Sequence, residues 1–188
     1  MFRKTFVPII LVFIVVCLLG AETSKMADIK TVTAAGHVKG ADYENSYFGV
    51  TVRLPQPNEQ LVLNGLVAEN RAILLEAVHA EGEMQQRHKF VIVAQSASIP
   101  GLSSTAQFVR SVRHQLEKEG FQTVRAEATV MIGGHEFIQS ELMMKDKSYW
   151  KAILATPIKG YMFGFWMEAS NKEQLDKATK LDGRISFR

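Results

Sequence analysis

Hydrophobic runs broken by glycine and proline turns occupy the chain from Thr123 to Glu168 and predict a meander of strands. The adjacent pair Gly133 and Gly134 suits a two-residue hairpin turn, because both residues tolerate positive φ. A second turn is predicted over Pro157–Gly160. The predicted strands are Thr123–Ile132, His135–Met144, Tyr149–Ala155 and Tyr161–Glu168.

Both faces of the last predicted strand are apolar. Because side chains alternate along a strand, one face carries Tyr161, Phe163, Phe165 and Met167. The other face carries Met162, Gly164 and Trp166. A sheet with two apolar faces needs cover on both sides. The helix that carries Phe108 is expected to cover one side, and the helix that carries Leu175 to add further cover. An open face would instead leave a partner- or lipid-docking surface centred on Trp166.

Capping signals define these two helices. Ser104 and Gln107 have the spacing of a capping box, and Gly120 is well placed to end the first helix. The second helix follows Ser170 and ends at Gly183. Further strands are predicted at Tyr47–Leu54, Phe90–Ala94 and Ile185–Phe187. The segment Arg71–Ala80 fits a buried strand or an amphipathic helix, and we favour the strand.

The N-terminus has the pattern of an export signal. A basic start at Met1–Lys4 precedes an apolar run over Phe6–Leu19, which is short for a full membrane span. Residues 1–21 are therefore predicted to be a signal peptide or an N-terminal membrane anchor. The expected location is extracytoplasmic, either periplasmic or secreted. Residues 22–45 lack periodicity and are predicted to be a flexible tether to one globular domain at 46–188.

Charge and cysteine content exclude some functions once the leader is set aside. The formal net charge of +3 falls to +1 without residues 1–21, because Arg3 and Lys4 leave with them. Such a balance gives no support for nucleic-acid binding. The only cysteine, Cys17, lies inside the apolar run, and Val16 before it is a poor match to a lipidation site. A chain cleaved after it has no disulfide, thiolate metal site or cysteine nucleophile.

A family resemblance starts at the first strand of the domain. Tyr43–Asn45, Tyr47–Val50 and the pair Leu54-Pro55 resemble the opening of PsbP-like domains, which include exported bacterial proteins of unknown role. The later order of elements agrees up to about Phe187, although Gln56–Asn58 stands where such domains often place a tryptophan. The resemblance implies an α/β/α sandwich and no enzyme activity. We therefore predict an α+β fold with a central, mainly antiparallel sheet covered by helices.

The histidines offer two weak metal hypotheses. His135–Gln139 is similar to the zinc-protease pattern, but its fifth residue is Gln and its context is a strand, so the two ligands would not share a helix face. His79 and His88 flank a loop and could approach each other across a hairpin, yet two imidazoles lack a third ligand. No metal, cofactor or catalytic residue is therefore assigned.

The favoured interpretation is an exported, non-enzymatic binding or accessory domain at the outer face of the cytoplasmic membrane. Its partner is expected to be an unidentified envelope protein or an apolar small molecule, with no nucleic acid. The membrane is involved only through an uncleaved N-terminal segment. The candidate partner surface comprises Trp150, Met162 and Trp166. One alternative is an extracytoplasmic hydrolase with a spatially assembled site, and a weaker one is a metal sensor using His79 and His88.

Overall fold

A computed structural model describes residues 28–54, 60–63, 67–68, 70–80, 87–98, 103–146 and 148–188. The leader predicted for residues 1–21 lies outside this part of the chain. The helices are α1 (Ile29–Ala34), α2 (Thr105–Lys118) and α3 (Lys172–Thr179). The strands are β1 (Gly36–Lys39), β2 (Asp42–Asn45), β3 (Val50–Arg53), β4 (Gln60–Val62), β5 (Val67–Ala68), β6 (Arg71–Ala80), β7 (Arg87–Ser96), β8 (Phe121–Ile132), β9 (His135–Met144), β10 (Trp150–Ile158), β11 (Tyr161–Ala169) and β12 (Ile185–Phe187).

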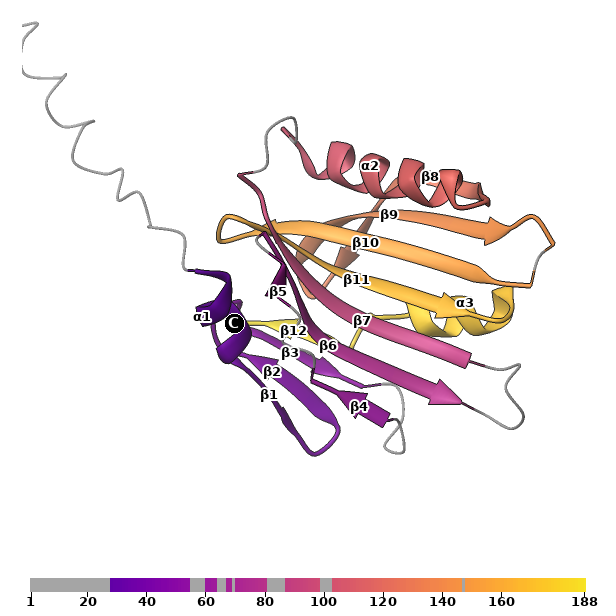
Figure 1. The fold of residues 1–188 in the computed structure, drawn as a ribbon. Coiled ribbons are helices and arrows are strands. Elements are labelled where there is room, and N and C mark those ends of the chain that lie inside the picture. Colours follow the sequence, from indigo (N-terminus) through magenta and orange to yellow (C-terminus); the bar gives the residue numbers. More distant parts are fainter. Residues whose placement is uncertain are drawn as a thin grey trace, which may run out of the picture.

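The larger sheet of the described chain has eight antiparallel strands in the order β4-β6-β7-β11-β10-β9-β8, with β5 also paired to β6 (Figure 1). The predicted meander is confirmed as its β8–β11 half. β11 lies in mid-sheet, because β10 pairs along one side of it and β7 along the other. Arg71–Ala80 is a strand, as favoured, and a register shift between Ile73 and Leu75 lets both Leu74 and Leu75 reach the core.

The turns of the meander are tight hairpins. Gly133 and Gly134 both have positive φ, at 55° and 82°, which confirms the first predicted turn. The second turn is shorter than predicted and consists of Lys159 (φ 48°) and Gly160 (φ 82°). Pro157 belongs to β10 instead. It lies beyond Ala155, the last β10 residue paired with β9, so its missing N–H removes no ladder hydrogen bond on that side.

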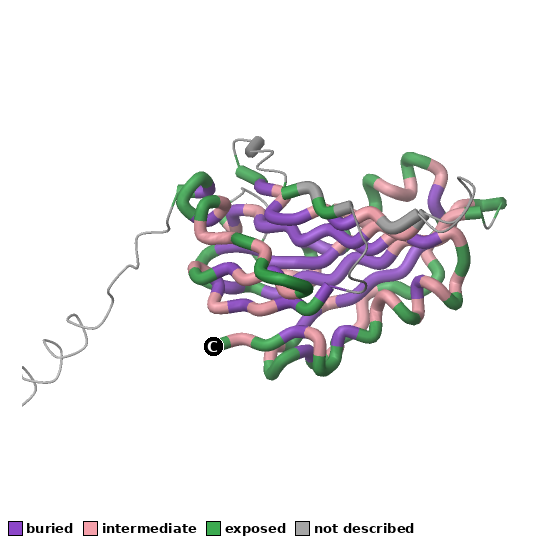
Figure 2. The backbone as a smooth tube through the Cα atoms, turned by 90° about the horizontal axis from the view of Figure 1, so that it is seen from below, coloured by how far each residue is buried: buried purple, intermediate pink, exposed green. Residues whose placement is uncertain are grey.

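A second, four-stranded sheet in the order β1-β2-β3-β12 packs with α1 and α3 against one side of the main sheet, which we call the inner face. Buried positions follow the strands between these layers (Figure 2). Phe163 is fully buried there, with its ring 4.9 Å from that of Phe48 and 6.2 Å from that of Phe187, centroid to centroid. Burial of each such aromatic contributes about 2 kcal/mol.

Helix α2 lies on the opposite, outer face, over β8, β9 and β10 (Figure 1). Ser104 caps the helix by accepting a hydrogen bond from the Gln107 backbone N–H at 3.2 Å, as its spacing predicts. The Gln107 side chain accepts from the Ser103 backbone N–H instead of the Ser104 N–H. Phe108 and Val109 are the buried residues of the helix, and Gly120 ends it with φ 99°.

Part of the predicted tether belongs to the folded domain. Residues 28–45 form α1, β1 and β2, whereas residues 22–27 lie outside the described chain. Buried Asn45 holds this segment together by donating to the carbonyl oxygen of Val32 at 3.0 Å and to the Tyr43 hydroxyl at 3.1 Å. Burial raises the pKa of Tyr43 to about 12, although the hydrogen bond from Asn45 opposes the shift.

The α+β class is confirmed, with two antiparallel sheets and a few helices. The inner face differs from the prediction, because a second sheet supplies much of its cover and α3 packs mainly on β10 and β11. None of the helices in the described residues combines the length and the apolarity that a membrane crossing requires.

Candidate functional site

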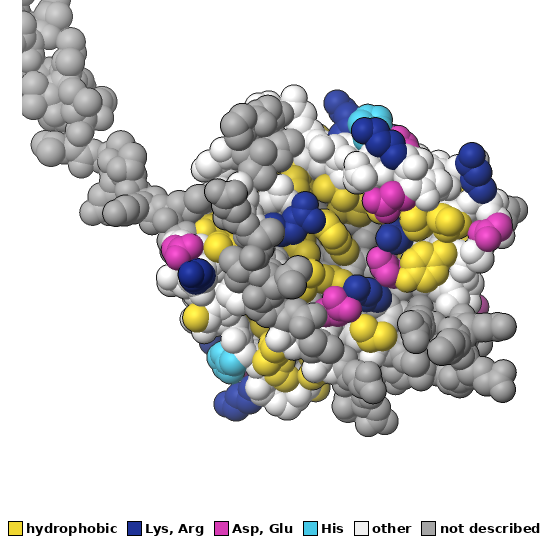
Figure 3. Space-filling model, in the orientation of Figure 1, with side chains coloured by type: hydrophobic (Ala, Val, Ile, Leu, Met, Phe, Trp, Pro, Cys, Tyr) yellow, Lys and Arg dark blue, Asp and Glu magenta, His cyan; other side chains and the backbone are white. Residues whose placement is uncertain are grey.

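A hollow in the described surface lies beside α2 on the outer face of the sheet. Because α2 sits over β8–β10, the outer side chains of β6, β7 and β11 form the floor of a groove of about 890 Å³. We call this hollow the α2 groove. Figure 3 shows it as an area of apolar surface below the helix, with basic and acidic side chains around it.

The floor of the α2 groove is apolar and crosses three strands. Val91 of β7, Trp166 of β11 and Ile153 of β10 are consecutive partners in register, so their side chains lie side by side. Val91 and Ile153 are only 4% and 2% exposed, whereas Trp166 is half-buried. Leu116 of α2 packs in the same cluster as Ile153 and Trp166 and forms part of the wall.

Ion pairs neutralise most of the charge at the edge of the groove. Lys89 Nζ lies 2.9 Å from Glu76 Oε1, and Lys151 Nζ lies 3.1 Å from Glu168 Oε1. Glu168 also accepts a hydrogen bond of 2.6 Å from the Tyr149 hydroxyl. Because Glu76 and Glu168 are both paired, neither offers a free carboxylate to a ligand in the groove.

Arg71 and Trp166 form the polar end of the groove. The Arg71 guanidinium lies over the indole ring, with Cζ 5.5 Å from the ring centroid, and its Nε donates to Gln95 Oε1 at 3.2 Å. No carboxylate in the described residues pairs with Arg71. Nε1 of Trp166 is shielded from solvent and has no hydrogen-bond acceptor among the described residues.

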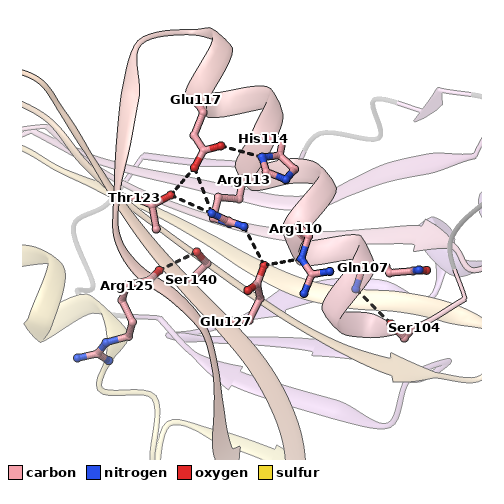
Figure 4. A network of polar contacts seen from close by, with 10 residues as sticks. All are labelled: Ser104, Gln107, Arg110, Arg113, His114, Glu117, Thr123, Arg125, Glu127 and Ser140. Carbon is pink, nitrogen blue, oxygen red and sulfur yellow. Dashed lines mark hydrogen bonds and ion pairs between the residues drawn. The ribbon is translucent and has the colours of Figure 1, made fainter.

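A polar network fixes α2 on β8 and so sets the width of the groove (Figure 4). Arg113, whose side chain is only 14% exposed, bonds Glu117 Oε1 at 3.1 Å and Glu127 Oε1 at 3.2 Å. Thr123 Oγ1 donates to Glu117 Oε1 at 2.6 Å. This hydrogen bond, followed by one from His114, lowers the pKa of the Glu117 carboxyl. A hydrogen bond from its own backbone N–H and the charge of Arg113 lower the pKa of Glu127.

The three residues of the predicted partner surface do not share one face. Trp166 lies in the floor of the groove. Met162 is on the same side of the sheet but packs under α2 against Phe108, and it is 5% exposed. Trp150 faces the inner side, where its ring lies 6.0 Å from Lys172 Nζ. Of the three, only Trp166 is both half-buried and part of the groove lining, whereas Trp150 is half-buried on the inner side.

A second polar cluster, which sequence reasoning missed, joins β9 to α3. Glu141 is 2% exposed and accepts from Gln139 Nε2 at 2.8 Å. Its carboxylate also contacts Arg125 Nη1 at 3.1 Å and Lys172 Nζ at 3.3 Å. Burial of Lys172 acts to lower its pKa, but hydrogen bonds to Asp176 and Glu141 outweigh this effect and raise it. Each charge in this cluster lies beside an opposite charge, so the cluster stabilises the link between α3 and β9.

The structure does not support either of the two metal hypotheses for the histidines within the residues that it describes. His135 lies at the start of β9 with its ring 4.2 Å from that of Phe187, so the helical zinc-protease geometry is absent. His79 and His88 are partners in the β6–β7 register, as the hairpin hypothesis expects. The described residues nevertheless contain no group of three or more side chains suited to a metal ion. Glu117 forms hydrogen bonds with both His114 and Thr123, so the acid lies between the imidazole and the hydroxyl. In a catalytic triad the histidine lies between the nucleophile and the acid, so this arrangement is not a triad.

Comparisons with known proteins do not identify a family. No protein-family model matches the chain, and no curated protein matches it. Membership of the PsbP-like family is therefore not shown. Among solved structures, the fold is similar to the crystal structure of LpqN, a protein involved in cell envelope biogenesis of Mycobacterium tuberculosis. The likeness has a TM-score of 0.41 at 14% sequence identity and covers 70% of this chain and 86% of that chain.

Proposed function

We propose that this protein is an exported, non-enzymatic binding domain that holds an apolar small molecule in the α2 groove. The observation that supports the proposal is a hollow of about 890 Å³ whose lining includes the half-buried apolar side chains of Ile73, Leu116 and Trp166. Ligand pockets in proteins are concave, mainly apolar and of comparable size. Export rests on the basic start and the apolar run of the leader.

A small molecule fits the groove better than a flat protein surface does. The floor lies below α2 on one side and below the ion pairs Lys89–Glu76 and Lys151–Glu168 on the other. A partner must therefore reach into a hollow. A binding role also fits the chemistry of the edge, because the acids there are held by lysines and are not available as a general base.

Binding of a neutral fluorescent probe, N-phenyl-1-naphthylamine, tests the proposal. We expect its emission to rise and saturate as it enters the apolar groove. Ile73→Asn, which puts an amide on the β6 part of the floor, should weaken binding. Val124→Asn is the matched control, because Val124 is 45% exposed on the edge strand β8 away from the groove.

Thermal melts establish that both variants are folded. The proposal fails if the wild-type protein shows no saturable binding, a result that would favour an envelope protein as the partner. It also fails if folded Ile73→Asn binds the probe as tightly as Val124→Asn does.

A further inference from the structure

Arg71 is placed to contact whatever occupies the floor of the α2 groove. It is the first residue of β6, and its exposed side chain crosses the outer face toward β11. The guanidinium reaches over the Trp166 ring, 5.5 Å from the ring centroid, and Gln95 anchors it through Nε. The cation thus lies over the same indole that forms part of the apolar floor.

The surroundings of Arg71 differ from those of Lys89, Lys151 and Arg110, three other cations around the groove. Carboxylates neutralise Lys89, Lys151 and Arg110, at 2.9, 3.1 and 3.3 Å respectively. No carboxylate in the described residues does so for Arg71, and Nε is the only guanidinium nitrogen with a hydrogen-bond acceptor there. Both terminal nitrogens therefore remain available as parallel donors. A planar fork of this kind matches the geometry of a carboxylate or phosphate.

We propose that the ligand of the α2 groove is an anionic amphiphile. Its apolar chain lies on Ile73, Leu116 and Trp166, and a single compact oxyanion head accepts hydrogen bonds from the terminal nitrogens of Arg71. This inference rests on the proposed function of the groove and names the chemical class of its ligand. The sites for the head and for the chain adjoin each other, because the guanidinium lies over the indole ring, 5.5 Å from its centroid.

The charge pattern determines which amphiphiles are selected. A neutral head leaves the Arg71 donors without a charged acceptor and gains only the burial of the chain. A cationic head is repelled by the same guanidinium. The groove therefore ranks ligands of equal chain length in the order anion, neutral molecule, cation. Carboxylate and phosphate heads share this recognition, and direct comparison separates the two.

Displacement of N-phenyl-1-naphthylamine measures this ranking. The full chain is expressed, and the protein that the cell exports is purified and freed of lipid. The competitors are dodecanoate, dodecyl phosphate and dodecanol, which share one chain length and differ in the head. We expect dodecanoate or dodecyl phosphate to bind the wild-type protein about tenfold more tightly than dodecanol does.

Substitutions at Arg71 assign the effect to one side chain. Arg71→Gln should reduce the advantage of the anions over dodecanol to less than about threefold and leave dodecanol affinity unchanged. Arg71→Lys, which keeps the charge but not the fork, should restore part of the advantage. Lys118→Gln removes a positive charge from an exposed α2 residue that also lines the groove, and it should leave the ranking intact.

The outcomes separate the two proposals. Equal affinity for anionic and neutral competitors in the wild-type protein would overturn the inference and leave the apolar groove in place. An anion preference that survives in folded Arg71→Gln, or that is lost in Lys118→Gln, would also overturn it. Failure of every competitor, together with failure of the probe itself to bind, would overturn the proposed function.

Discussion

Gly164 is a position where the smallest enlargement of a side chain should disrupt the centre of the sheet. It lies in β11, opposite Ala155 of β10 and Val93 of β7. A Cβ added there would lie 2.3 Å from the carbonyl oxygen of Leu154, whereas ordinary contact begins near 3.4 Å. Its φ lies outside the left-handed region, so the cost of Gly164→Ala is one of space.

The loss of stability depends on which atoms must shift to make room for the new Cβ. The obstacle is a main-chain oxygen between two paired strands, where Leu154 is 1% exposed and Ala155 is 0% exposed. Overpacking of a core typically costs 1–3 kcal/mol, and a backbone obstacle places this substitution at the upper end, about 3 kcal/mol. For a chain of this length, such a loss lowers the melting temperature by roughly 10 °C.

Thermal and urea unfolding monitored by circular dichroism measures the effect. Gly40→Ala is the control, because Gly40 has positive φ (62°) but no atom within 4 Å of the added Cβ. It should cost only about 1 kcal/mol, from left-handed backbone strain. If Gly164→Ala melts at the temperature of the wild-type protein, or above Gly40→Ala, the close approach of Gly164 to Leu154 is refuted.

Three other predictions concern the hairpin and the α2 network. Gly133→Val and Gly134→Val should each destabilise the protein by about 1–2 kcal/mol, with Gly133→Val the worse, because its Cβ meets a β12 carbonyl oxygen at 3.0 Å. Unchanged melting temperatures for both would show that the turn is misplaced. The pKa of Glu117 is lowered from 4.5 in the folded state, so its contribution to stability is present above that pH and is lost as the pH falls below it. Thr123→Val removes the main cause of the shift and should make the acid-induced loss of melting temperature shallower, and an identical acid profile would contradict this assignment. Arg113→Met keeps the apolar stem but removes the guanidinium that both Glu117 and Glu127 contact, so urea unfolding should show a loss of about 2 kcal/mol at low salt, and no loss would contradict the proposed clamp.

Local signals in the sequence were sufficient for the meander and for both ends of α2. The end of α3 was predicted wrongly, because the helix stops at Thr179 and not at Gly183. Gly133 and Gly134 mark a hairpin wherever they occur between two apolar runs, because the turn needs positive φ and little else. Ser104 marks the start of α2 for a similar reason, since its hydroxyl satisfies an orphan backbone N–H three residues on. Such features depend on neighbouring residues alone and can be read from the chain.

Features that depend on distant partners were not predictable in this way. Residues 28–45 have no clear periodicity, because their strands are four residues long and are held by side chains such as Asn45. The two tryptophans lie on opposite faces of the sheet because of the register between β10 and β11. Trp150 pairs with Ala169, whose side chain faces the inner core, whereas Trp166 pairs with Ile153 on the outer face. A shift of the pairing by one residue would place both on the same face.

The α2 groove results from the off-centre position of the helix. A single helix about 10 Å in diameter cannot cover the whole width of a sheet of eight strands spaced about 5 Å apart. The network of Arg113 with Glu117 and Glu127 fixes α2 over the β8 edge, so the outer face of β6, β7 and β11 is left beyond its reach. Trp166 is the large aromatic that this position leaves half-buried, while Met162, four residues before it on the same face, is covered by Phe108. The sequence alone predicted apolar side chains on both faces of β11. The ion pairs between α2 and β8 decide which of them stay accessible to a ligand.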